Sequence, residues 1–147
     1  MKRALLIVNP KVRRLLALPL LLLVGCDDGG RARTVGGPLP QCTHAGSAVA
    51  LAASLNDFPL PPGAVIDKSR MDAHGNTVVG GYVRGELDAL REYFDDELPK
   101  HDYELGRGNA AGDIADRAFA GHGVAGTLTL RAIPGCDDAL TVQIGLL

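Results

Sequence analysis

The chain has 147 residues with 15 basic and 17 acidic side chains, a length that supports one domain with a single hydrophobic core. Five basic residues lie before residue 15, so the chain from residue 26 onward carries ten basic and 17 acidic side chains, a formal charge of −7. This acidic balance, without a basic stripe, argues against nucleic acid as a partner and against purely electrostatic binding to a membrane.

The first 25 residues have the order of charges and apolar side chains of a secretory signal peptide. A basic head precedes an apolar run from Leu15 to Val24, and no acidic residue occurs before Asp27. A positive head, an apolar stretch of about 7–15 residues and a small residue before the cut are typical of such peptides. A membrane-spanning helix needs about 20 apolar residues, and the polar segment 9–14 interrupts the run. We therefore expect this segment to be a secretory signal peptide.

The sequence Leu23-Val24-Gly25-Cys26 resembles the lipobox of bacterial lipoproteins. The resemblance covers residues 1–26 only and implies that the chain is cut before Cys26, whose thiol becomes a diacylglycerol thioether. Two or more acyl chains on one protein give stable anchoring, at about 0.8 kcal/mol per buried methylene. The resemblance thus implies a lipid-anchored protein on the extracytoplasmic face of the cell membrane, with its membrane contact made through Cys26.

Residues 26–41 are predicted to form a flexible tether. The sequence "DDGGRARTVGGPLPQ" is rich in glycine and proline and has only one valine and one leucine among its side chains. Such a composition buries too little apolar surface to order itself. We expect residues 42–147 to form a single α+β domain.

With Cys26 lipidated, Cys42 and Cys136 remain. Disulfides persist in exported proteins, and an even number of remaining cysteines favours pairing. We expect a Cys42–Cys136 disulfide that closes a loop of nearly the whole domain. Two unpaired buried thiols are the alternative; a metal site at Cys42 and His44 has no second pair of ligands at close spacing.

The first half of the domain is predicted to begin with a helix and continue as a hairpin. The alanine-rich segment Ser47–Leu55, with Ser47 as its N-cap, predicts a short helix, and the prolines of 59–63 then break the chain. Strands are expected at Ala64–Arg70 and Thr77–Val83, joined by the turn "DAHGN". The pair Gly80-Gly81 indicates a bulge or a close backbone approach.

The clearest helix is predicted over Glu86–Leu98. Leu87, Leu90, Phe94 and Leu98 recur at helical spacing and form one apolar stripe. Acidic residues occupy the first turn, where the helix dipole favours them. We expect Pro99 to end the helix.

The last segments alternate in the manner of strands. Leu128, Leu130 and Ala132 share one face of a strand, and Val142, Ile144 and Leu146 share one face of the next. Residues 121–123 and 134–138 are the expected turns, and short turns imply antiparallel neighbours. The sequence predicts an α+β two-layer sandwich, with an antiparallel sheet of about four to six strands, the 86–98 helix on one face and a short N-terminal helix.

The stretch from "LPPGAVI" to "DYELGRG" is similar to small α+β domains of many bacterial exported lipoproteins. Most of those domains have no assigned activity. The resemblance spans about half of the mature chain and implies a fold more than a function.

Motifs that could carry chemistry are weak. Gly106–Ala111 matches the dinucleotide pattern G-x-G-x-x-A, but no acidic residue lies between Asp116 and Asp137, and the segments beyond have strand patterns. A glycine-rich loop is the better interpretation. The histidines, His44, His74, His101 and His122, form no H-E-x-x-H or i, i+4 pair for a metal, and no serine lies in a G-x-S-x-G motif. Asp95-Asp96-Glu97 is interpreted as a solvated helix face.

We therefore expect no enzyme, no cofactor and no metal, with no catalytic residues. The leading expectation is a non-catalytic interaction or scaffolding module that contacts an envelope protein or polymer. The alternative is a binding protein for a small ligand or envelope polymer, held in a groove between helix and sheet, with Tyr82, Tyr93 or Tyr103 as candidate contacts. A third interpretation is an enzyme with a non-motif site. A closed, well-packed domain without a concave pocket would favour the scaffold over both of these.

Overall fold

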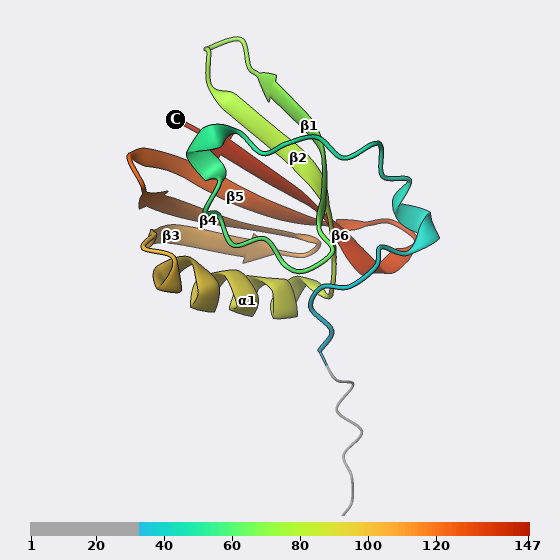
Figure 1. The fold of residues 1–147 in the computed structure, drawn as a ribbon. Helices are drawn as coiled ribbons and strands as arrows, with labels where there is room; N and C mark the ends of the chain where they lie inside the picture. The colour runs from blue at the N-terminus through green and yellow to red at the C-terminus, as the bar shows by residue number, and fades with distance from the viewer. Residues whose placement is uncertain (1–32) are drawn as a thin grey trace, which may run out of the picture. The chain divides into compact units, whose positions relative to one another are not determined.

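The structure is a computed structural model that describes residues 33–147 (Figure 1). The predicted signal peptide, Cys26 and the first part of the expected tether lie outside these residues. Within residues 33–147, no helix is both long and apolar enough to span a membrane.

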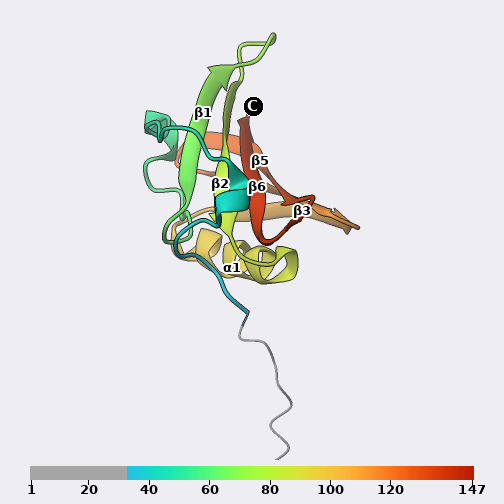
Figure 2. The ribbon, with the colours of Figure 1, turned by 90° about the vertical axis from the view of Figure 1, so that its right-hand side faces the viewer.

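The described chain is an antiparallel six-stranded sheet with one main helix. The elements are β1 (Val65–Met71), β2 (Thr77–Arg84), α1 (Leu87–Lys100), β3 (Glu104–Ala111), β4 (Ile114–Gly121), β5 (Val124–Ile133) and β6 (Cys136–Leu146). The strand order is β1-β2-β6-β5-β4-β3, and α1 packs against β3, β4 and β5. Figure 2 shows the twist of the sheet, in which β1 and β3 run in clearly different directions. The expected α+β class is confirmed, and the sheet dominates it.

Helix α1 forms because its apolar residues fall on one stripe. Leu90, Phe94 and Leu98 are at most 1 % exposed and belong to the core of the domain. The expectation that Pro99 ends the helix is wrong, because the helix runs through Pro99 to Lys100. Proline removes its own N–H from the ladder and its ring crowds the carbonyl one turn earlier, but the backbone N–H of His101 still donates to Glu97 O at 3.2 Å.

The prediction of a helix over Ser47–Leu55 is wrong. Residues 44–52 have no regular secondary structure, and only Ala53–Leu55 form a single 3-10 turn. The backbone N–H of Val49 donates to Ile66 O at 2.7 Å, and Gly46 N–H donates to Asp67 Oδ2 at 3.0 Å. A nine-residue helix is too short to be stable alone, and the free edge of β1 offers its backbone a partner instead.

The β1–β2 hairpin agrees with the sequence. The register slips between Ile66 and Lys68, so Asp67 is an extra residue opposite the Gly80-Gly81 pair. A Cβ on Gly81 would overlap the carbonyl oxygen of Val65. The two glycines are therefore explained by a close backbone approach beside a bulge, as expected.

The turn of this hairpin is held by Asp72. Its Oδ1 accepts the backbone N–H groups of His74 at 2.8 Å and Asn76 at 2.9 Å. The hydrogen bond from the Asn76 backbone is the largest cause that lowers the pKa of Asp72 from its ordinary 3.8. Because the folded state then binds fewer protons than the unfolded state, this contribution is present above about pH 4 and is lost as the pH falls through the lowered pKa.

We predict that an NMR titration places the Asp72 carboxyl pKa below 3.8 and that Asp72→Asn weakens the dependence of stability on pH below about pH 4. The asparagine keeps the amide-accepting oxygen but has no proton to gain in this range. The measurement is urea unfolding of both proteins between pH 3 and pH 7. An Asp72 pKa at or above 3.8 would contradict the turn geometry.

Strands β3 to β6 form a continuous meander. Leu128 pairs with Ile144 and Leu130 with Val142, so the two apolar stripes expected for β5 and β6 lie side by side on one face. Gly106–Ala111 is not a loop, which corrects the sequence interpretation. These residues belong to β3 and pair with β4, with a bulge between Leu105 and Gly108. Glycine and alanine are accommodated in this strand because their backbone groups pair with β4, whereas a loop would have no such partner.

The core is centred on the ring of Phe58, which lies in the irregular segment before β1. Its centroid is 6.1 Å from that of Phe94, 5.5 Å from Tyr103 and 5.2 Å from Phe119. The segment around Phe58 therefore covers part of the same sheet face as α1, and one side chain from it joins the helix to β4.

The last residues of the expected tether contact the domain. Val35 forms a β-bridge with Gly85, the N–H of Gly36 donates to Arg84 O at 2.9 Å, and Gly37 N–H donates to Pro62 O at 2.7 Å. We call residues 34–43 the N-terminal strap. The structure contains the expected Cys42–Cys136 disulfide, with a Cα–Cα distance of 5.7 Å, so the strap is covalently joined to the start of β6. The domain's contacts thus begin before Cys42, where the sequence placed its start.

Candidate ligand-binding pocket

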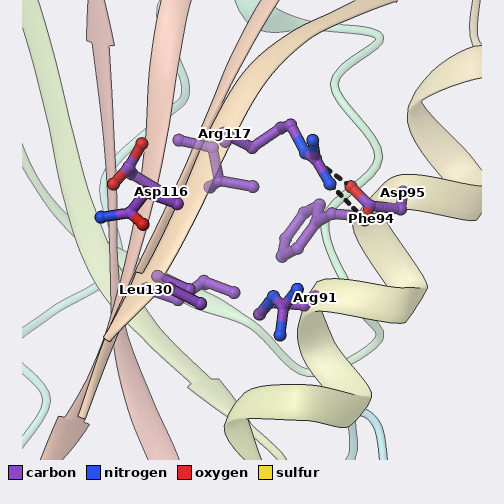
Figure 3. Close-up of a pocket in the computed structure, with 11 residues that line it drawn as sticks. Arg91, Phe94, Asp95, Asp116, Arg117 and Leu130 are labelled. Carbon is purple, nitrogen blue, oxygen red and sulfur yellow. Dashed lines mark hydrogen bonds and ion pairs between the residues drawn. The ribbon is translucent and has the colours of Figure 1, made fainter. Parts of the chain in front are cut away.

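A pocket of about 320 Å³ lies between α1 and strands β3, β4 and β5 (Figure 3). Arg91, Phe94 and Asp95 contribute from the helix, 108–110 from β3, 115–117 from β4, and Leu128 and Leu130 from β5. Small residues create the space. Gly108, Ala110 and Ala115 stand where larger side chains would fill the gap between helix and sheet.

The pocket has a buried apolar end and an exposed mouth. Phe94, Ala115, Leu128 and Leu130 are each at least 97 % buried. The three residues from β3 that line the pocket are exposed. The pocket is therefore deepest over β5 and opens at β3, the last strand of the sheet.

An ion pair crosses the pocket wall. Arg117 on β4 donates from Nε to Asp95 Oδ1 at 2.8 Å and from Nη2 to Asp95 Oδ2 at 2.5 Å, and Figure 3 shows this two-pronged contact. Each side chain is about one third exposed. A Cβ on Gly108 would stand 2.9 Å from Arg117 Nη1, so the glycine makes room for the guanidinium. The pair fixes α1 to β4 and sets the width of the pocket.

Arg91 is the second guanidinium at the pocket. Its side chain is 41 % exposed, and Nη1 donates to Asp88 Oδ1 at 3.1 Å. In Figure 3, Arg91 and Phe94 project from α1 toward the strands. A guanidinium has five N–H donors, so Arg91 keeps donors for a carboxylate, a phosphate or another acceptor at the mouth.

We predict that the coupling between Arg117 and Asp95 is about 1 kcal/mol in a double-mutant cycle, because the pair is bidentate and partly buried. The cycle uses Arg117→Met, Asp95→Asn and the double variant, with the free energy of unfolding measured in urea. Arg33 and Glu92 provide the control, since this pair is 2.6 Å apart but 59 % and 64 % exposed. A coupling for Arg117 and Asp95 no larger than that of the control pair would contradict the assignment.

The tyrosines expected as ligand contacts do not line the pocket. Tyr103 is 2 % exposed and packs in the core, and burial raises the pKa of its hydroxyl. Tyr93 is half-buried against Phe94, with centroids 5.3 Å apart, and Tyr82 is half-buried on β2. The three tyrosines lie far apart in the sequence, and none of them lines the pocket.

The histidines are likewise dispersed. His122 occupies the β4–β5 turn, where Nε2 is 2.8 Å from His101 O. Among the described residues, no three side chains of the His, Cys, Asp or Glu types gather to form a metal site. Asp95-Asp96-Glu97 was interpreted as a solvated face; Asp96 is exposed, whereas Asp95 is paired with Arg117 and Glu97 with Lys100 at 2.7 Å.

The sequence predicts a groove between helix and sheet as an alternative, but it assigns none of these lining residues to a binding site. The available signal was weak: small residues at inward positions of β3 and β4, opposite a helix whose stripe carries one phenylalanine. No family model matches this chain, and no curated protein or solved structure matches it either. The function is therefore argued from the geometry of the chain itself.

Proposed function

We propose that the protein is a lipid-anchored envelope lipoprotein whose domain binds a small ligand, or part of an envelope polymer, in the pocket between α1 and β3–β5. The observation that supports this proposal is the pocket itself. Its volume of about 320 Å³ lies at the lower end of the range for ligand sites, which combine apolar walls with a few polar groups.

The lining defines the chemistry of the ligand. Phe94, Leu128 and Leu130 favour a compact apolar group at the buried end, and Arg91 at the mouth favours an acceptor or anion. Asp95 already accepts two hydrogen bonds from Arg117. The lining holds no serine, cysteine or histidine, so the arrangement supports binding rather than nucleophilic catalysis.

The test is a screen of small aliphatic and aromatic carboxylates, detected by chemical shift changes of the Leu128 and Leu130 methyl groups. Ala110 pairs with Ala115 and shares its face, whereas Ala111 is on the opposite face; both are exposed. Ala110→Phe should block the mouth and abolish the shifts, and Ala111→Phe should leave them unchanged. If no compound moves either methyl group in the parent protein, the proposed function is wrong.

A non-catalytic interaction or scaffolding role is the second candidate, supported by the outer face of the sheet. Asp116, Thr129 and Gln143 lie in one row across β4, β5 and β6, and Asp116 and Gln143 are exposed. A photoreactive residue at Gln143 that crosslinks to a single envelope protein in cells would favour this role. Crosslinks made only from Ala110 would favour the pocket.

The lipid anchor is tested at Cys26. We predict that Cys26→Ala abolishes acylation and releases the protein from the membrane fraction, because the lipobox contains no other cysteine that could form the thioether. An inhibitor of the lipoprotein signal peptidase should make the parent protein accumulate with residues 1–25 attached. An alanine variant that is still acylated and membrane-bound would contradict the lipobox assignment.

A further inference from the structure

We propose that the ligand is an extended peptide segment that pairs with β3 as a seventh strand and places an apolar side chain in the α1–β5 pocket. This inference rests on the proposed function of the pocket and names the class of molecule that occupies it.

The two edges of the sheet differ in a way that points to β3. The edge of β1 is covered by the chain itself near Ile66 and Asp67, since Val49 N–H donates to Ile66 O and Gly46 N–H donates to the Asp67 carboxylate. Within residues 33–147, no strand pairs with the outer edge of β3. Proteins usually protect such edges, because unpaired main-chain groups attract another strand.

The main chain of β3 is suited to accept a strand. A two-residue turn, with Gly112 at φ 60°, joins Ala111 to its partner Ile114. In such hairpins the closing pair is hydrogen-bonded and alternate residues face away. The N–H and C=O groups of Gly108 and Ala110 therefore point outward. The segment Gly108–Ala111 is exposed, and its short side chains allow a second backbone to approach.

The pocket opens at this same edge. In an added strand, alternate side chains point to the same face, so every second residue of a peptide paired with β3 faces α1. One such side chain reaches the mouth at Ala110 and continues toward Phe94, Leu128 and Leu130. Main-chain pairing thus supplies affinity, and the pocket selects an apolar residue.

Charge distinguishes a peptide from a second copy of this chain. The elements that border the edge, α1, β3 and β4, carry four of the nine basic residues in 33–147 and seven acidic residues. Arg91 at the pocket mouth and the exposed Arg107 on β3 favour an acidic side chain beside the apolar one. The same helix exposes Glu92 and Asp96. Pairing of β3 with β3 of a second copy would bring two acidic helices together.

The experiment selects phage-displayed random heptapeptides on the mature, acylated protein in lipid nanodiscs, with Ala110→Phe as the counter-selection. A synthetic copy of an enriched peptide is then measured by fluorescence anisotropy. We expect an apolar residue next to an acidic one, a loss of affinity of at least tenfold with Ala110→Phe, and no loss with Ala111→Phe. N-methylation of alternate peptide amides should weaken binding at least tenfold, and methylation of the other amides should not.

Several outcomes would overturn the inference. These are no enrichment over the Ala110→Phe counter-selection, binding that is insensitive to N-methylation, and a stable dimer in light scattering that Ala110→Phe dissolves. If the small carboxylates still move the Leu128 and Leu130 methyl groups, the pocket remains a ligand site and only the peptide assignment fails. If they do not, the proposed function fails as well.

Discussion

Replacing Cys42 and Cys136 together by alanine is expected to lower the free energy of unfolding by on the order of 4–5 kcal/mol. The two residues are 94 positions apart, so the disulfide closes a loop of most of the domain and removes a large number of unfolded conformations. A domain of this size has a total stability of about 5–15 kcal/mol. The disulfide should therefore account for a large share of the total stability.

The loss is expected to begin at the N-terminal strap. Cys42 lies in the strap and Cys136 begins β6, so without the bridge the strap is held by few contacts, among them those of Val35, Gly36 and Gly37. Urea unfolding of the double variant and of the parent protein in reducing agent should agree. Thr43→Ala is the control, because it removes a buried side chain from the strap and leaves the bridge intact. A double variant no less stable than this control would contradict the prediction.

The strands and the main helix were predictable because their patterns are local. Alternation placed Leu128, Leu130, Val142 and Ile144 on their faces before any pairing was known, and the helical stripe placed Phe94 in the core. The pairing of β2 with β6 is different. It joins residues about 60 positions apart, and a hydrophobic pattern gives the face of a strand but not its neighbour.

The prediction of a helix at Ser47–Leu55 was wrong because it considered helix propensity without the competing hydrogen bond to the backbone of β1. Alanine favours helix by a few tenths of a kcal/mol per residue, whereas the free edge of β1 offers the same backbone hydrogen bonds to an extended chain. The prediction of a glycine-rich loop at Gly106–Ala111 was wrong because these residues form a strand. Glycines indicate loops when they are read alone, but here they admit the Arg117 guanidinium and leave an accessible edge.

A groove between helix and sheet was an alternative expectation, but the residues that line the pocket could not be predicted, because the pocket is an absence of side-chain volume. It exists where Gly108, Ala110 and Ala115 come together beneath α1, and these residues belong to two strands whose register sequence patterns do not give. The ion pair between Arg117 and Asp95 depends on the same register, so a run of three acids was interpreted as a uniform solvated surface.

Phe58→Ala is expected to destabilise the domain by about 3–5 kcal/mol, the usual cost of removing a buried aromatic ring. Phe58 is 4 % exposed and contacts three other rings, on α1, before β3 and on β4. Together with Leu55, which is fully buried, it joins an irregular segment to the core. Its loss leaves a cavity and also removes one of the two buried apolar attachments of residues 53–62.

Two matched variants separate these effects. Phe58→Leu keeps an apolar side chain at the site and should cost less than half as much as Phe58→Ala, since much of the space stays filled. Leu60→Ala, at a partly buried position of the same segment, should cost less than either. Hydrogen exchange adds a second measurement, because Val49 N–H is bonded to Ile66 O and its protection depends on the segment lying against β1. If Phe58→Ala exposes the Val49 amide while Phe58→Leu does not, an apolar side chain at position 58 holds the segment that covers the β1 edge near Ile66. Parent-like protection in both variants would show that this part of the edge is covered independently of residue 58.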